Sequence, residues 1–301
     1  MEGLPGRIKA ETKEGVHKNI EERAQEHALE LVRARFETGP EENRLAYHNS
    51  SHTEGVIRRA LKIAEALELS EEQKRLVVIA ASFHDVVQEW EPQDKGEGVV
   101  FRKRKIGDNE RAAAEEAVAW MKEQEDGDFT EADYELVRSA IQITEPDWDI
   151  DNKTVMQKGL NETTDPTIRA AVLADLSSGA MEPETFKEEG RQLFIEEQLD
   201  IIEALKRAES PSDIPEAVQQ AYQTRYRTWL SVQEGFVRGR EARFKTELAG
   251  IDEKKIERVH QLFSRFDESI QIANDNVAEA NQQDFITFAR TLVPGAFRLA
   301  A

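Results

Sequence analysis

Apolar residues recur at steps of three and four positions along almost the whole chain, which is the period of an α-helix. Residues that end helices are sparse: the 301 residues include only 16 glycines and 9 prolines. Runs of β-branched residues are short, so few segments favour a strand. The sequence therefore predicts an all-α protein with almost no sheet.

Start and stop signals divide this pattern into predicted helices. A first helix covers about residues 8–36 and ends at a Thr-Gly-Pro breaker cluster. A second helix is expected behind a capping box of Ser51 and Glu54, and a third behind Ser70 and Gln73. These caps predict that residue 52 lies at a helix N-terminus.

The middle of the chain begins with a break in the pattern. Residues 91–108 contain a proline and three glycines, and we expect a long loop there. Helices are then expected at about residues 109–124, 131–144 and 166–179. Thr130 and Asp165 are the predicted caps of the last two, and Pro166 suits a first helical position. Helices of these lengths suit a compact bundle.

The remainder of the chain predicts three longer helices. They are expected at about residues 184–208, 214–249 and 252–292. Tyr222, Trp229 and Phe236 recur every seven residues and form a stripe along one face of the middle helix. We interpret this stripe as core packing rather than as a ligand site.

Acidic residues dominate the charge: 60 Asp and Glu against 40 Lys and Arg give a formal net charge of −20. This argues against non-specific binding to nucleic acid or to an anionic membrane, because both require excess positive charge. The absence of cysteine excludes disulfides, thiolate nucleophiles and Cys-ligated zinc. No apolar run approaches the ~20 residues that span a bilayer, and residues 1–20 are too charged for a secretory signal. We expect a cytoplasmic protein that meets any anionic substrate at a local basic patch.

Histidine is rare, and half of its six copies fall next to predicted helix ends within one stretch: His48, His52 and His84. Imidazole and carboxylate together bind divalent first-row metals, and Asp85 directly follows His84. A His-Asp pair alone is weak evidence, since a lone helix histidine is more often a core or surface residue than a ligand.

Asp175 strengthens the case for a metal. It belongs to a predicted helix face that includes Ile168, Ala171 and Val172, so its carboxylate is expected to be buried. Burial of an ionised group is unfavourable by several kcal/mol unless a cation compensates it. The sequence leaves two compensating partners open, a metal ion or an arginine.

Four segments together resemble one family. They are Tyr47-His48-Asn49-Ser50-Ser51-His52, Ala81-Ser82-Phe83-His84-Asp85, Asn109-Glu110-Arg111-Ala112-Ala113 and Ala174-Asp175-Leu176. Their order and spacing resemble the predicted metal-dependent HD phosphohydrolases. The resemblance implies that an isolated His, a His-Asp pair and a distal Asp bind one divalent metal inside a helical bundle. These ligands would be His52, His84, Asp85 and Asp175.

The resemblance also sets expectations about domains and the metal. It covers about residues 40–180 well, so we expect an HD-type phosphohydrolase core at residues 1–180. Residues 181–301 would form a helical region that packs on this core or extends it. Mn, Mg, Fe, Co, Ni and Zn remain open as the metal. Residues 141–146 contain no histidine where relatives often have one, which argues for a single metal.

Three further side chains are candidates for catalysis. Asp85 is placed to accept a proton from the attacking water, and Glu110 is a candidate acid or base near the metal ligands. His48 lies four residues before His52. It is expected either to donate to a substrate phosphate or to make a structural hydrogen bond.

A basic run stands out in this acidic chain: Arg102, Lys103, Arg104 and Lys105 are consecutive and lie in the expected loop. Both ends of that loop lead to residues of the proposed site, so the run is a candidate for binding a phosphorylated substrate. Phe101 could stack on a base. The alternative is a solvated charge run that offsets neighbouring acids.

The favoured function is metal-dependent hydrolysis of a phosphate ester or phosphoanhydride. The expected substrate is a nucleotide or another small phosphorylated molecule. The alternative is a non-catalytic helical binding or regulatory protein with a vestigial HD site. Metal-dependent oxygenation is a third option, which the shortage of histidines disfavours. All four expected metal ligands are present, which favours an enzyme over a vestigial site. Assembly into a homo-oligomer remains open.

Overall fold

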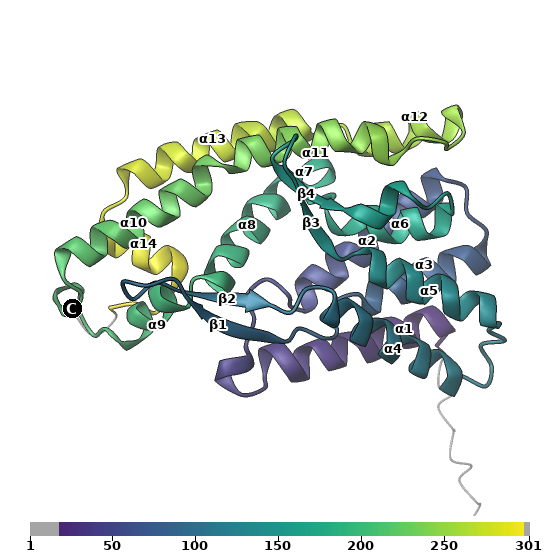
Figure 1. Ribbon diagram of the computed structural model, residues 1–301, viewed down its shortest axis with the longest axis horizontal. Coiled ribbons are helices and arrows are strands. Elements are labelled where there is room, and N and C mark those ends of the chain that lie inside the picture. The colour runs from purple at the N-terminus through teal and green to yellow at the C-terminus, as the bar shows by residue number, and fades with distance from the viewer. Residues whose placement is uncertain (1–17, 298–301) are drawn as a thin grey trace, which may run out of the picture.

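The structure, a computed structural model, describes residues 18–297 and consists mainly of helices (Figure 1). The first elements are α1 (Ile20–Val32), the π-helical turn η1 (Arg33–Glu37), η2 (Glu41–Asn43), α2 (Ser50–Ala66), α3 (Glu71–Phe83), β1 (Trp90–Asp94), β2 (Val100–Arg104), α4 (Asp108–Glu123), α5 (Glu131–Ile143), β3 (Pro146–Asp149), β4 (Thr154–Gln157), η3 (Lys158–Asn161), α6 (Pro166–Asp175) and α7 (Ser178–Met181). The predicted all-α class is confirmed.

The chain then continues through the helices in the upper and left parts of Figure 1. They are α8 (Pro183–Glu197), α9 (Leu199–Arg207), η4 (Pro211–Asp213), α10 (Glu216–Ser231), α11 (Gln233–Glu247), α12 (Glu253–Leu262), α13 (Phe266–Gln282) and α14 (Phe285–Leu292). None of the helices in residues 18–297 combines the length and apolar character needed to cross a membrane.

The helix caps agree with the sequence at three of four sites. Ser70, Thr130 and Asp165 each accept hydrogen bonds from the first turn of the following helix. The capping box at Ser51 and Glu54 is wrong, because α2 begins at Ser50, two residues earlier than a cap at Ser51 would place it. Its cap is Asn49, whose side chain accepts from the His52 N–H at 3.0 Å. His52 still lies in the first turn of α2, as predicted.

The long loop expected at residues 91–108 is wrong. Strands β1 and β2 pair there as an antiparallel hairpin, with Trp90 opposite Arg104 and Asp94 opposite Val100. Gly96 and Gly98 close its turn with positive φ angles of 87° and 79°, which glycine adopts without strain. The glycines read as loop signals thus belong to a β-turn, and a second small hairpin pairs β3 with β4.

Several predicted helix limits are also wrong. Residues 18 and 19 lie outside α1, which begins at Ile20 behind the cap Asn19, and residues 8–17 of the predicted first helix lie outside the described residues. The helix expected to reach residue 179 ends at Asp175, before the short α7. The three long C-terminal helices are divided into α8 and α9, α10 and α11, and α12 to α14. Gln198 and Val232 stand at two of these breaks, and neither residue type signals an end of helix.

Most of the buried apolar side chains form one cluster that runs from Ile20 in α1 to Ile270 in α13. It includes Phe186 and Val237, so the larger core continues past residue 181. A smaller cluster joins the end of α8 to α9, α10 and α14. In Figure 1, α8 runs between the bundle around α2, α3 and α6 and the long helices α10 and α13. The α8 helix therefore belongs to both packed regions.

Candidate metal centre

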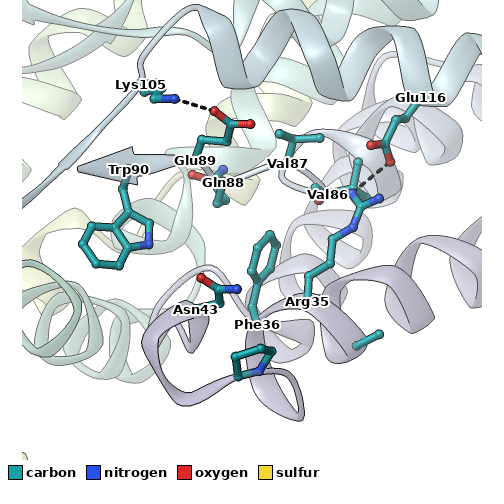
Figure 2. Close-up of a pocket in the computed structure, with 12 residues that line it drawn as sticks. Arg35, Phe36, Asn43, Val86, Val87, Gln88, Glu89, Trp90, Lys105 and Glu116 are labelled. Carbon is teal, nitrogen blue, oxygen red and sulfur yellow. Dashed lines mark hydrogen bonds and ion pairs between the residues drawn. The ribbon is translucent and has the colours of Figure 1, made fainter. Parts of the chain in front are cut away.

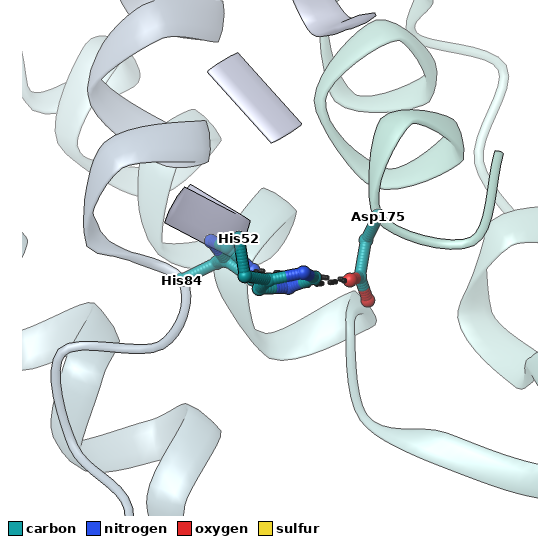
Figure 3. Close-up of side chains that lie close together, drawn as sticks. All are labelled: His52, His84 and Asp175. Atoms are coloured by element: carbon teal, nitrogen blue, oxygen red, sulfur yellow. Dashed lines mark hydrogen bonds and ion pairs between the residues drawn. The ribbon is translucent and has the colours of Figure 1, made fainter. Parts of the chain in front are cut away.

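Three helix ends bring the proposed metal ligands together. His52 lies in the first turn of α2, His84 caps the C-terminus of α3, and Asp175 is the last residue of α6. Figure 3 shows these three side chains converging, and one ligand atom of each lies within 4.8 Å of the others. The short side chain of Asp85 follows His84 and points to the same place.

The distances between the ligand atoms are close to those of a coordination sphere. The two Nε2 atoms of His52 and His84 are 3.4 Å apart. Asp85 Oδ2 lies 3.3 Å from the Nε2 of His52 and 3.0 Å from that of His84. Asp175 Oδ1 lies 3.4 Å and 3.8 Å from the same two nitrogens. Metal bonds of about 2.0–2.2 Å would place adjacent ligand atoms roughly 3–3.5 Å apart, so one ion fits between them.

Hydrogen bonds at Nδ1 of each imidazole direct its Nε2 toward the space between the four ligand atoms. The Nδ1 of His84 lies 2.8 Å from the carbonyl oxygen of Ala81, to which it can only donate. The Nδ1 of His52 lies 3.3 Å from Glu189 Oε1, again an acceptor when ionised. In its neutral form each imidazole therefore presents an Nε2 lone pair, which is the form that binds a metal.

Two glutamine amides hold the outer oxygens of the two aspartates. Gln88 donates to Asp85 Oδ1 at 2.8 Å, and Gln157 donates to Asp175 Oδ2 at 3.0 Å. Arg104 donates to Gln88 Oε1 at 2.7 Å, which fixes the direction of that amide. The inner oxygen of each carboxylate is left facing the imidazoles.

The electrostatics of the cluster favour a cation. Burial raises the pKa of Tyr47, and the nearby carboxylates Glu189, Asp175 and Asp85 raise it further. Burial would lower the pKa of His52, but hydrogen bonds with the surrounding carboxylates raise it well above its ordinary value. No arginine in residues 18–297 forms an ion pair with Asp175, so the arginine alternative is not supported. A divalent metal satisfies two nitrogen and two oxygen donors and leaves coordination positions open.

A cavity of about 1130 Å³ opens beside the cluster. Asp85, Asp175 and His48 line it, so the proposed ligands are accessible from the cavity. Both hairpins contribute to its walls, with Phe101 from β2 and Trp148 from β3. The cavity is large enough for an organic molecule of the size of a nucleotide.

Arg102, Lys103 and Arg104 lie on β2 and Lys105 directly follows it. All four residues of the basic run line this cavity, but each already has a partner. Arg102 stacks on Trp90 at 3.9 Å and donates to the carbonyl oxygen of Glu196 at 3.1 Å. The guanidinium of Arg104 lies 3.5 Å from Glu110. The two lysines form exposed ion pairs across the hairpin, Lys103 with Glu91 at 3.2 Å and Lys105 with Glu89 at 2.6 Å.

His48 and Glu110 are buried and line the cavity, but neither is held in a metal-ligand position. His48 Nδ1 lies 2.5 Å from Glu196 Oε1. Burial would raise the pKa of Glu196, but His48 and the backbone N–H groups of Tyr47 and His48 lower it to about 2. Glu110 Oε2 accepts from the Gly107 N–H at 2.6 Å, which closes the first turn of α4. Glu110 thus has a structural bond that the sequence did not predict.

Helix α8 supplies site residues that the sequence analysis missed. Glu189 and Glu196 contact His52 and His48 respectively, and Glu197 lines the cavity. Burial and the neighbouring Glu196 raise the pKa of Glu197 to about 7. The spacing of seven residues places Glu189 and Glu196 on one helix face, but acidic residues are so frequent in this chain that the spacing alone is not distinctive.

A second cavity, of about 680 Å³, is lined by Val86 and Val87, the two residues that follow Asp85 (Figure 2). There Arg35 of η1 donates to the Val86 carbonyl oxygen at 2.6 Å and to Glu116 at 2.9 Å. Val86 is the residue after Asp85, so these bonds support the backbone that carries the His-Asp pair.

Comparison with known families agrees with this geometry. The model of the HD domain matches residues 49–178, a range that contains all four proposed ligands. Comparisons with curated proteins and with solved structures give no significant match. HD domains bind divalent metals, and most members of the family are metal-dependent hydrolases. Residues 49–178 are therefore an HD domain.

Proposed function

We propose that this protein hydrolyses a phosphate ester or phosphoanhydride of a small molecule, with one divalent metal held by His52, His84, Asp85 and Asp175. The observation that supports this most is the convergence of two imidazole Nε2 atoms and two carboxylate oxygens, all at 3.0–3.8 Å from a neighbour. A bound divalent ion would act there as a Lewis acid and activate water for attack on phosphorus.

The side chains around the cluster would support this reaction. Asp85 lines the cavity, and its carboxylate is the candidate to take a proton from the attacking water. His48 directs Nδ1 to Glu196, so its Nε2 would donate to a phosphate oxygen only when both ring nitrogens carry a proton. Glu110 is half of a helix cap and is the weaker candidate for proton transfer.

The cavity walls favour a nucleotide as the phosphorylated substrate. Phe101 and Trp148 offer aromatic faces on two different hairpins, and the Trp148 side chain is 54% exposed. Lys103 and Lys105 add positive charge to the cavity wall, although their ion pairs weaken its field. In a chain of net charge −20, this local charge is the candidate means of attracting an anion.

A phosphate-release assay tests the proposal. The purified protein is stripped with a chelator, reloaded with Mn²⁺, Mg²⁺, Fe²⁺, Co²⁺, Ni²⁺ or Zn²⁺, and assayed on a panel of nucleotides and sugar phosphates. We expect release with at least one metal, and loss of release in Asp175→Asn. If metal binds but no substrate is hydrolysed under any of these conditions, the non-catalytic alternative is favoured instead.

A further inference from the structure

We propose that Glu189 is a positioning residue of the metal centre, contributed by a helix that lies outside the HD-domain match of residues 49–178. The inference rests on the metal site of the proposed function. Glu189 does not face the metal position itself. It acts through His52, whose ring it orients from the side opposite to Nε2.

The contacts of Glu189 are buried and specific. Its side chain is 9% exposed, and Oε1 lies 3.3 Å from His52 Nδ1. The same oxygen lies 3.4 Å from two nitrogens of Arg59, a fully buried side chain. Arg59 in turn donates to the Ala174 carbonyl oxygen at 2.9 Å, one residue before Asp175. Glu189 is therefore connected to two of the proposed ligands through hydrogen bonds.

The two ligand histidines differ in how they are oriented. His84 donates to Ala81 of its own helix, so its ring is set by α3 alone. For His52, Glu189 is the one hydrogen-bonding partner of Nδ1 among the described residues. A carboxylate that accepts from Nδ1 fixes the tautomer with a free Nε2 and makes that nitrogen a stronger ligand. The metal affinity of this site should therefore depend on α8.

A role limited to neutralising Arg59 does not account for the arrangement. Arg59 Nη1 also lies 3.3 Å from Glu182 Oε2, so the guanidinium keeps an acidic partner without Glu189. His52 has no such replacement on its Nδ1 side within residues 18–297. Removal of the Glu189 carboxylate should thus affect His52 more than Arg59.

The test is the affinity of the metal-free, full-length protein for Mn²⁺, measured by isothermal titration calorimetry. Glu189→Ala should weaken binding about 10–100-fold, the range typical for such an outer carboxylate. Glu189→Gln should weaken it less, because its amide oxygen still accepts from Nδ1. Glu188→Gln is the matched control, since the neighbouring Glu188 pairs with Arg191 away from the cluster, and its affinity should equal that of the wild type.

Thermal unfolding separates orientation of His52 from general stabilisation. If Glu189→Ala lowers the Tm without metal but keeps the wild-type increase in Tm on adding Mn²⁺, Glu189 stabilises the fold only and the inference is wrong. Unchanged Mn²⁺ affinity in Glu189→Ala would also overturn it while leaving the proposed function intact. Absence of divalent metal binding by the wild type would instead reject the metal site, and both proposals with it.

Discussion

At the scale of single residues, each proposed metal ligand is oriented by a hydrogen bond to the atom that points away from the metal position. A backbone carbonyl, a glutamate and two glutamines occupy the outer atoms of the histidines and aspartates, so the inner atoms have only each other as partners. Two carboxylates and two imidazole lone pairs in close contact repel one another unless a cation lies between them. The cluster therefore favours a positive charge at this point, which a protonated imidazole or a divalent metal would supply.

Replacement of a single ligand should remove the metal without unfolding the protein. His84→Ala and Asp85→Ala each delete one donor from the cluster, while the apolar core of α2, α3 and α6 stays in place. We expect metal content to fall from one equivalent per chain to near zero, with unchanged helical circular dichroism. Elemental analysis checks this after loading at equal metal concentrations. Wild-type metal content in both variants would disprove their assignment as ligands.

At the scale of elements, the hairpin β1–β2 changes how the basic run is understood. In an extended strand, neighbouring side chains point to opposite faces, so four consecutive basic residues cannot act as one flexible cationic loop. Arg102 and Arg104 bond to the body of the protein, whereas Lys103 and Lys105 are exposed. Only the lysines can be removed without disturbing contacts inside the protein.

The double variant Lys103→Ser/Lys105→Ser tests whether this strand attracts the substrate. We expect kcat/KM for a phosphorylated substrate to fall several-fold at low salt and its dependence on ionic strength to flatten, because a long-range attraction is lost. Lys122→Ser/Lys187→Ser is the control, since it removes the same charge from positions that do not line the cavity. An equal fall in both double variants would mean that only the net charge matters.

Two neighbouring residues of α8 should give opposite pH dependences of stability. The pKa of Glu196, about 2, is below its ordinary 4.5, so its contribution is present above pH 4.5 and lost as pH falls toward 2. The pKa of Glu197, about 7, is above 4.5, so its contribution is present below pH 4.5 and lost as pH rises toward 7.

Urea unfolding of the metal-free protein at several pH values measures both effects. Glu197→Gln should reduce the loss of unfolding free energy between pH 5 and pH 8 by about 1–3 kcal/mol, because the side chain at position 197 then has no carboxyl that ionises in this range. Glu196→Gln should instead flatten the decline between pH 4.5 and pH 3. A Glu197→Gln profile parallel to that of the wild type would show that this carboxyl titrates normally.

Cap residues and breaker residues in the sequence predicted which helices exist better than they predicted where each helix begins and ends. Ser70, Thr130 and Asp165 cap helices as expected because their side chains bond the first turn, which is a local interaction. Asn49 and Ser51 are both good caps, and only the packed structure selects Asn49. The breaks at Gln198 and Val232 are not marked by any helix-ending residue type in the sequence.

At the scale of the whole molecule, the HD domain depends on helices that follow it. The sequence could predict the four proposed ligands from their order, because they lie within the residues that the HD-domain model matches. It could not predict Glu189 and Glu196, because they come from α8, and their partners are more than 130 residues away in the chain. The larger core likewise takes side chains from α8, α11, α12 and α13. The larger core thus takes side chains from both sides of residue 180.

A chain that ends at residue 182 should not fold into a metal-binding unit. It would lose Glu189 and expose the apolar surface that packs against Phe186, Val237 and Phe263. Exposure of that surface removes burial worth about 25 cal/mol per Å² and favours aggregation.

A chain that ends at residue 283 is the control, because it lacks only α14 and the residues after it and keeps both α8 and the larger core. We expect cooperative thermal unfolding and Mn²⁺ binding in the control and neither in the shorter chain. If the shorter chain unfolds cooperatively and binds Mn²⁺ as the full-length protein does, residues 1–182 form an independent domain and α8 has no part in the metal centre.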